Sequence, residues 1–149
     1  MLNLIRTDST NKDFVTLVKE LDEYLAILDG DEHAFYNQFN RITSLKHAIV
    51  AYENGIPVGC GAIKEFAPDA IEVKRMYVLP DQRGKGIASK MLAELERWAK
   101  ELNYVRCVLE TGKKQPEAIA LYNKSGYTNI PNYGQYVNVA NSVCFEKKL

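Results

Sequence analysis

A glycine-rich turn at residues 78–89 is the part of the sequence that most directly indicates chemistry. A strand-like stretch leads into Gly84 and Gly86, and a helical pattern follows. Glycine lets the backbone approach an anion closely, and the first N–H groups of a helix have no intrahelical acceptor. Arg83 and Lys85 add positive charge at the same place. The turn is therefore expected to bind a pyrophosphate group, the alternative being that it only joins a strand to a helix.

The spacing of this turn excludes two common phosphate-binding motifs. The dinucleotide fingerprint requires a third glycine where this chain has Ser89, and it follows the first strand of its fold. The P-loop pattern G-x-x-x-x-G-K-[ST] is absent from the sequence. What remains is Arg83-x-x-Gly86-x-Ala88, placed between a strand and an amphipathic helix.

This remaining pattern resembles the Q/R-x-x-G-x-G/A signature of the GNAT family of N-acetyltransferases, which binds the pyrophosphate of acetyl-CoA. A second stretch, residues 115–127, resembles the family's N-x-x-A-x-x-L-Y-x-x-x-G-[FY] signature. The matching residues are Ala118, Leu121, Tyr122, Gly126 and Tyr127. Gln115 stands where the family has Asn, and it keeps the side-chain amide one carbon further out.

The resemblance implies where acetyl-CoA would bind. In the family the pantetheine arm lies in a splayed gap between two parallel strands, which correspond to residues 72–78 and 105–110. A main-chain N–H on the first of these strands would polarise the thioester carbonyl. The implied cofactor-binding residues are Met76, Tyr77, Val78, Arg83, Gly84, Lys85, Gly86, Ile87, Ala88, Ser89, Gln115 and Tyr122.

The resemblance also implies a general acid, and the chemistry requires a base. Tyr122 would protonate the departing thiolate, the alternative being a packed helix tyrosine. A primary amine has a pKa of about 10.4, so it must lose a proton to react at neutral pH, and a carboxylate can take that proton directly or through water. Glu72 is the first candidate, because strand alternation would put it on one face with Lys74, Met76 and Val78.

Glu110, on the neighbouring predicted strand, is the second candidate for the base. Either carboxylate could instead form an ion pair with Lys74 or Arg75. The acceptor pocket is expected between the first two helices and the loop at residues 132–138. Its aromatic candidates are Tyr24, Tyr36, Tyr133 and Tyr136, which could equally be core or surface residues.

Composition limits the remaining classes of function. The chain has 149 residues, 46% hydrophobic and 26% charged, which suits a single domain over residues 1–149. The sequence has no run of 18 apolar residues and no leader pattern, so we expect neither a membrane span nor a signal peptide. A cytoplasmic location is therefore expected. The formal net charge is zero, which gives no reason to expect nucleic acid as a partner.

Charge is nevertheless unevenly distributed along the chain. Residues 1–40 carry eight acidic and three basic side chains, and residues 74–106 carry eight basic and four acidic ones. A basic middle suits a phosphorylated cofactor, and an acidic N-terminal part suits a cationic second substrate or is only a solvated helix face. Cys60, Cys107 and Cys144 are expected to be reduced core residues, and the two histidines are too isolated to bind a metal.

Periodicity places these residues in a mixed α+β fold. Apolar residues repeat at helical spacing over residues 12–30, 32–41 and 87–102. Pro116 suits the start and Gly126 the end of a short helix at 115–125, so about four helices are predicted. Strands are predicted at 2–6, 47–53, 56–66, 70–78, 105–111, 127–130 and 142–149, with a two-residue hairpin turn at Asn54-Gly55. This order matches the GNAT topology: a twisted, mostly antiparallel sheet with one splayed parallel pair.

These inferences predict an acetyl-CoA-dependent N-acetyltransferase, acting on a primary amine of a small molecule or peptide in a ternary complex. The main alternative is a non-catalytic acyl-CoA-binding sensor on the same fold. Acylation of a protein lysine or N-terminus, and a phosphate-binding fold unrelated to CoA, are further alternatives. Members of the family are often dimers, so a homodimer is also considered.

Overall fold

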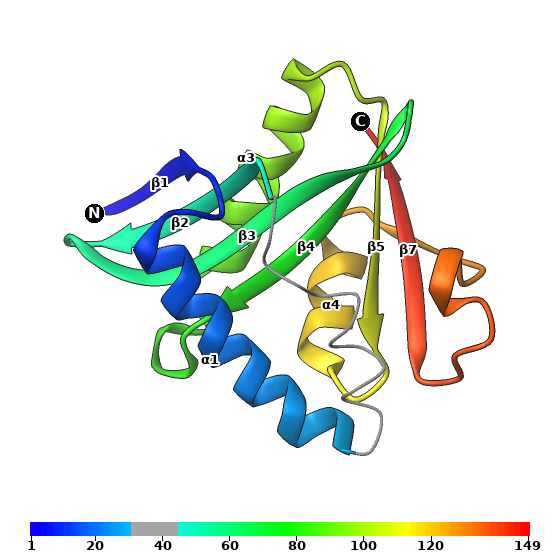
Figure 1. Ribbon diagram of the computed structural model, residues 1–149, viewed down its shortest axis with the longest axis horizontal. Coiled ribbons are helices and arrows are strands. Elements are labelled where there is room, and N and C mark those ends of the chain that lie inside the picture. Colours follow the sequence, from blue (N-terminus) through cyan, green and yellow to red (C-terminus); the bar gives the residue numbers. More distant parts are fainter. Residues whose placement is uncertain (31–44) are drawn as a thin grey trace.

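A single twisted sheet organises the chain (Figure 1). The structure is a computed structural model that describes residues 1–30 and 45–149. The helix predicted at 32–41 lies outside the described residues. The sheet has seven strands in the order β1-β2-β3-β4-β5-β7-β6. All described neighbours pair antiparallel except β4 and β5, which are parallel. The predicted mixed α+β class is therefore confirmed.

The predicted elements agree with the observed ones to within two residues at each end in the described chain. The strands are β1 Leu2–Thr7, β2 His47–Glu53, β3 Ile56–Ala67, β4 Ala70–Val78, β5 Arg106–Gly112, β6 Thr128–Ile130 and β7 Ser142–Lys148. The helices are α1 Lys12–Asp29, α3 Ile87–Glu101 and α4 Pro116–Lys124, with short 3-10 helices η2 Pro80–Gln82 and η3 Gly134–Tyr136. The Asn54-Gly55 hairpin turn is confirmed, with φ values of 53° and 81°.

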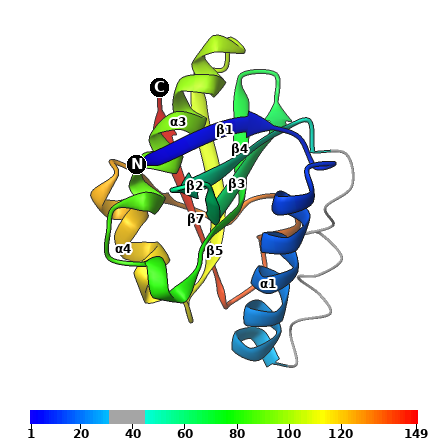
Figure 2. The same cartoon turned by 90° about the vertical axis from the view of Figure 1, so that its left-hand side faces the viewer.

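The helices cover both faces of the sheet. Figure 2 shows α1 on one side and α3 with α4 on the other. On the α1 face, Phe14 and Leu17 pack with Ala48 and Val50 of β2. On the opposite face, Met91 and other α3 residues pack with Ile49 and further strand residues. Alternate residues of β2 therefore enter two separate cores, as expected for a sheet buried on both faces.

Local sequence signals set the ends of α1. The side chain of Asn11 accepts hydrogen bonds from the N–H groups of Asp13 and Phe14, so it caps two otherwise unpaired donors. Gly30 ends the helix in a positive-φ conformation, at 54°. The helix so delimited packs against β2, β3 and β4.

Glycines in β3 allow close packing against β4 and α3. A Cβ atom on Gly61 would lie 2.6 Å from Met76 Sδ and 3.0 Å from a methyl carbon of Leu95. On Gly59 it would lie 3.0 Å from the Tyr77 carbonyl oxygen. The backbones and side chains approach closely at these two glycines, and the β3–β4 register also shifts between Cys60 and Ala62.

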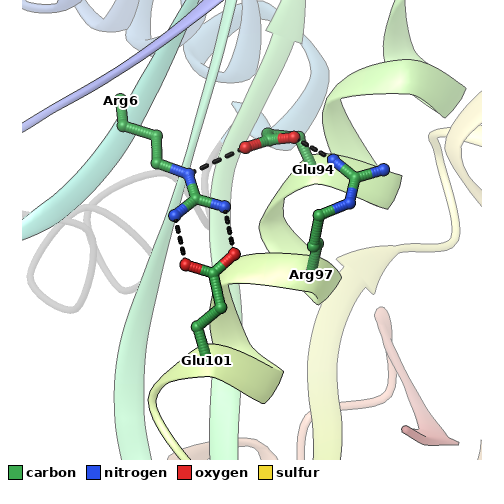
Figure 3. A network of polar contacts seen from close by, with 4 residues as sticks. All are labelled: Arg6, Glu94, Arg97 and Glu101. Atoms are coloured by element: carbon green, nitrogen blue, oxygen red, sulfur yellow. Dashed lines mark hydrogen bonds and ion pairs between the residues drawn. The ribbon is translucent and has the colours of Figure 1, made fainter.

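A charged cluster joins β1 to α3 (Figure 3). Arg6 donates to Glu101 through Nη1 and Nη2, at 2.7 and 2.8 Å, and to Glu94 through Nε at 2.8 Å. Glu94 also accepts from Arg97. The bidentate geometry fixes the first strand of the sheet to the helix that begins at the glycine-rich turn.

Two further sequence expectations have structural outcomes. Cys60, Cys107 and Cys144 are all buried on strands as free thiols, as predicted. No helix among residues 1–30 and 45–149 is long and apolar enough to cross a membrane.

Candidate active site

The glycine-rich turn forms an open pocket at the N-terminus of α3. Gly84 and Gly86 have φ values of 82° and 78°, which favour glycine, and a Cβ atom on either would meet no atom within 4 Å. Gly86 occupies the N-cap position and provides no side-chain cap. The lining residues are Val78, Gln82, Arg83, Gly84, Gly86, Ile87, Ala88, Ser89 and Lys124. Uncapped helix N–H groups, glycines and two cations at one pocket suit a phosphate-bearing ligand.

The two predicted cations of the turn have protein partners of their own. Arg83 donates from Nε to the Val78 carbonyl at 3.0 Å, and its guanidinium carbon lies 5.3 Å from the Tyr24 ring centroid. Lys85 donates to Gln82 Oε1 at 2.9 Å. Lys124, in the last turn of α4, also lines this pocket and was not among the predicted site residues. Nothing in the local sequence connects it with a turn about forty residues earlier, because its position depends on the tertiary packing of α4.

A channel continues from this pocket between α1 and α4. Strands β4 and β5 pair only from Ala70 to Glu72, opposite Arg106 to Val108, and then diverge. The predicted splayed parallel pair is confirmed. The channel is lined by Leu21, Tyr24, Met76, Tyr77, Val78, Arg83, Ala88, Gln115, Glu117, Ala118, Leu121 and Tyr122. Ile87 borders the pocket at the turn but not this channel, and its side chain is 3% exposed and packs in the core.

A bulge in β4 contradicts one prediction about side-chain directions. We expected Glu72, Lys74, Met76 and Val78 to share a face, but Met76 and Val78 pack in the α3-side core. Arg75 adopts a φ of 59°, and the register of β4 with β3 shifts there. A bulge adds one residue to the strand, so alternation reverses beyond it.

Two carboxylates meet at the far end of the channel. Glu72 from β4 and Glu110 from β5 line a cavity of about 100 Å³. Its other lining residues are Leu21, Leu25, Val73, Lys74, Arg75, Met76, Thr111, Gln115, Ala118, Tyr122 and Tyr136. We call this cavity the carboxylate pocket. Five of its residues, among them Met76 and Tyr122, also line the channel, so the two spaces are continuous.

Hydroxyl groups from the C-terminal part of the chain hold both carboxylates. The Tyr133 hydroxyl donates to Glu72 Oε2 at 2.6 Å, and the Ser142 hydroxyl donates to Glu110 Oε2 at 2.7 Å. Lys74 Nζ lies 3.7 Å from Glu72 Oε1. The ion pair considered between Glu72 and Lys74 is thus present, while Arg75 pairs instead with Asp22 of α1 at 2.6 Å.

Burial changes the acidity of Glu110 and Tyr122. Desolvation raises the pKa of Glu110 to about 7; the hydrogen bond from Ser142 opposes this rise, and the charge of Glu72 adds to it. Burial, with the charge of Glu110, raises the pKa of the Tyr122 hydroxyl well above its ordinary value. The pocket therefore combines a carboxyl group that titrates near neutral pH with a phenol that keeps its proton.

The four predicted acceptor-site tyrosines have different positions. Tyr136 lines the carboxylate pocket, and Tyr133 contacts it through Glu72. Tyr24 lines the channel instead. Tyr36 lies outside the described residues. Within residues 1–30 and 45–149, no group of three or more His, Cys, Asp or Glu side chains is arranged to hold a metal ion.

Comparisons with known proteins give consistent results. Residues 14–127 match the profile of the acetyltransferase (GNAT) family. An IAA acetyltransferase of Azospirillum brasilense is 35% identical over 137 residues, which are 91% of this chain and 90% of the relative. The crystal structure of a proposed acyl-CoA N-acyltransferase from Klebsiella pneumoniae superposes with a TM-score of 0.85. Its sequence is 31% identical, and the match covers 100% of this chain and 98% of the other. The PaiA N-acetyltransferase of Thermoplasma acidophilum, crystallised with coenzyme A, shares the fold with a TM-score of 0.73 at 18% identity over 100% and 99% of the chains.

Proposed function

Since the chain belongs to the acetyltransferase (GNAT) family, we propose that it transfers an acetyl group from acetyl-CoA to a primary amine of a small molecule or peptide. The amine would attack directly, with both substrates bound. One observation supports this above all: the glycine-turn pocket, the channel and the carboxylate pocket are continuous through shared lining residues. An extended ligand with an anionic end and a reactive end fits such an arrangement.

The residues of the glycine turn fit the anionic part of acetyl-CoA. The N–H groups at the start of α3 and the side chains of Arg83 and Lys124 would hold the pyrophosphate. The backbone of residues 76–78 borders the gap left by the diverging strands and would hold the extended arm. Acetyl-CoA itself supplies an activated acetyl group on a thiol that leaves readily. The PaiA protein, which shares this fold, was crystallised with coenzyme A, which supports coenzyme A as the ligand.

The carboxylate pocket would accept the proton of the attacking amine. We assign this role to Glu72 and Glu110 together, because both line the cavity next to Tyr122. A general base works best when its pKa is near the operating pH, and burial brings the pKa of Glu110 to about 7. Holding amine and thioester side by side would contribute the larger part of the rate.

Tyr122 would donate a proton to the departing sulfur. Its raised pKa means that the hydroxyl is protonated at neutral pH, as a general acid must be. The ring is fixed by Tyr127 and Phe145, whose centroids lie 5.7 and 6.0 Å away. A thiol has a pKa of about 8.5, so thiolate is a fair leaving group and this assistance is modest.

Calorimetric titration with acetyl-CoA, with ATP as control, tests the first step. The proposal requires acetyl-CoA to bind well above ATP, followed by thiol release when amines are added. Binding of acetyl-CoA without thiol release from any amine would support a non-catalytic sensor instead. Binding of ATP but not acetyl-CoA would overturn the cofactor assignment.

The pH dependence of kcat/KM separates the two carboxylates. If Glu110 takes the proton, the wild type loses activity as the pH falls through about 7, and Glu110→Gln removes that dependence. Glu72→Gln should still lose activity as the pH falls, but with a lower midpoint, because the charge of Glu72 raises the pKa of Glu110 in the wild type. The opposite pattern would assign the base to Glu72.

A further inference from the structure

The segment at residues 131–142 supplies both hydroxyl groups that hold the acids of the carboxylate pocket. Tyr133 donates to Glu72 Oε2 at 2.6 Å, and Ser142 donates to Glu110 Oε2 at 2.7 Å. Glu72 lies on β4, 61 residues before Tyr133 in the chain. The position of this carboxylate therefore depends on a distant segment that nothing in the local sequence of β4 indicates.

The ring and the backbone of Tyr133 are both fixed. The ring centroid lies 4.7 Å from that of Phe66 in β3 and 6.0 Å from that of Tyr136 in η3. The Tyr136 N–H donates to the Tyr133 carbonyl oxygen at 2.9 Å. The side-chain amide of Asn132 donates to two carbonyl oxygens later in the segment, each at 3.1 Å. Packing and hydrogen bonds of this kind hold the hydroxyl in one position relative to Glu72.

Tyr133 is connected to the pocket through Glu72. It is not one of the described residues that line the carboxylate pocket, the channel or the glycine-turn pocket, so a ligand in these spaces would not touch it. The Glu72 side chain, in contrast, lines the carboxylate pocket and is only 12% exposed. The direct route by which Tyr133 affects the reaction is therefore the carboxylate that it holds.

The Tyr133 hydroxyl keeps its proton and donates it in this hydrogen bond. Burial, and next the charge of Glu72, raises the pKa of the hydroxyl far above its ordinary value. A hydrogen bond from a hydroxyl to a carboxylate is shorter and stronger than one between neutral groups, and 2.6 Å is in the range for such a bond. Oε2 of Glu72 is thereby fixed on Tyr133, and Lys74 Nζ lies 3.7 Å from Oε1. The carboxylate thus has a defined orientation in the pocket.

On the basis of the proposed function, we propose that Tyr133 is a positioning residue, which holds the Glu72 carboxylate in the orientation that assists removal of the amine proton. The amine nitrogen bonds to the acetyl carbon as the carbon–sulfur bond breaks. The amine proton passes to the carboxylate pair of Glu72 and Glu110, and Tyr122 protonates the sulfur. Tyr133 neither gains nor loses a proton. Its contribution is geometric, because a base must lie within hydrogen-bonding reach of the proton that it removes.

Tyr133→Phe tests this inference, because it removes the hydroxyl and keeps the ring. Thiol release is measured with the fastest acceptor among phenylethylamine, spermidine, alanine and trialanine. We expect kcat to fall by about tenfold or more, the effect of one hydrogen bond to a charged group. The KM for the amine and the Kd of acetyl-CoA should stay within about twofold of the wild type, because the lost interaction acts in the transition state. A raised KM with unchanged kcat would show a purely structural role and overturn the inference.

Tyr104→Phe is the matched control. The Tyr104 hydroxyl also donates to a glutamate, Glu65 Oε1, at 2.6 Å, but neither residue lines the carboxylate pocket or the channel. Its kcat should equal that of the wild type. A loss in Tyr104→Phe as large as that in Tyr133→Phe would overturn the inference, because any buried tyrosine–glutamate bond would then have the same effect.

A double-mutant cycle shows whether Tyr133 acts through Glu72. In Glu72→Ala, which leaves no acceptor for the hydroxyl, Tyr133→Phe should change kcat by less than about twofold. If the alanine variant does not fold, Glu72→Gln takes its place, and the effect of Tyr133→Phe should shrink by about threefold or more because the acceptor is uncharged. An equal loss in both backgrounds, or wild-type kcat in Tyr133→Phe, would overturn the inference while confirming amine acetylation. Absence of thiol release from every amine in the wild type would overturn the proposed function as well.

Discussion

Burial of Glu110 predicts a pH-dependent stability that Glu110→Gln removes. The carboxyl group holds its proton to about pH 7 in the folded protein, against an ordinary pKa of 4.5. A difference of this size corresponds to about 3 kcal/mol. Because the folded-state pKa is raised, the stability that this group contributes is fully present below about pH 4.5. It is lost as the pH rises through about 7.

The magnitude can be measured by urea denaturation of the wild type and Glu110→Gln at about pH 5 and about pH 8. Linkage gives a loss of about 2.5 kcal/mol between these two values for this group alone. Glutamine has nearly the same shape and can still accept the hydrogen bond from Ser142, but it does not titrate. The difference in unfolding free energy between wild type and variant should therefore change by about 2.5 kcal/mol in favour of the variant as the pH rises.

Glu23→Gln provides the matched control, since this glutamate is exposed on α1. Its unfolding free energy should follow that of the wild type at both pH values. If Glu110→Gln also ran parallel to the wild type, within about 0.5 kcal/mol, Glu110 would not be a desolvated carboxyl group. The argument from burial, and with it the role of Glu110 as a base near neutral pH, would then be wrong.

Three further substitutions test the site and its support. Gly86→Glu should abolish acetyl-CoA binding in calorimetry, because a carboxylate would enter the pocket proposed for the pyrophosphate. Gly86→Ala is the control that separates this charge effect from the strain of a φ of 78°. Wild-type affinity in Gly86→Glu would refute the location of the site. Tyr122→Phe should keep acetyl-CoA binding but slow thiol release by about tenfold or more, and unchanged turnover would remove Tyr122 as the acid. Gly61→Ala should lower the unfolding free energy, measured by urea denaturation, by about 1–3 kcal/mol, because the new Cβ atom would lie 2.6 Å from Met76 Sδ. A variant as stable as the wild type would show that the Met76 side chain moves aside freely.

Local sequence patterns were sufficient to locate the helices, the strands and the glycine turn. Helix caps, the Asn54-Gly55 turn and apolar periodicity are local properties, so they can be read without knowledge of distant contacts. The turn at residues 84–86 is equally local, because its function depends on backbone conformation and on the helix that begins directly after it. The two spaced motifs were sufficient to indicate the family that the comparisons then showed.

The set of side chains that meet in the carboxylate pocket depends on contacts between segments far apart in the chain. The bulge at Arg75 reverses the alternation of β4, and it depends on the pairing of β4 with β3, so strand periodicity alone placed Met76 and Val78 on the wrong face. Lys124 lines the glycine-turn pocket, and Ser142 contacts Glu110, through packing between distant segments. The raised pKa of Glu110 has the same origin, because desolvation is a property of the whole surrounding fold and not of neighbouring residues in the chain.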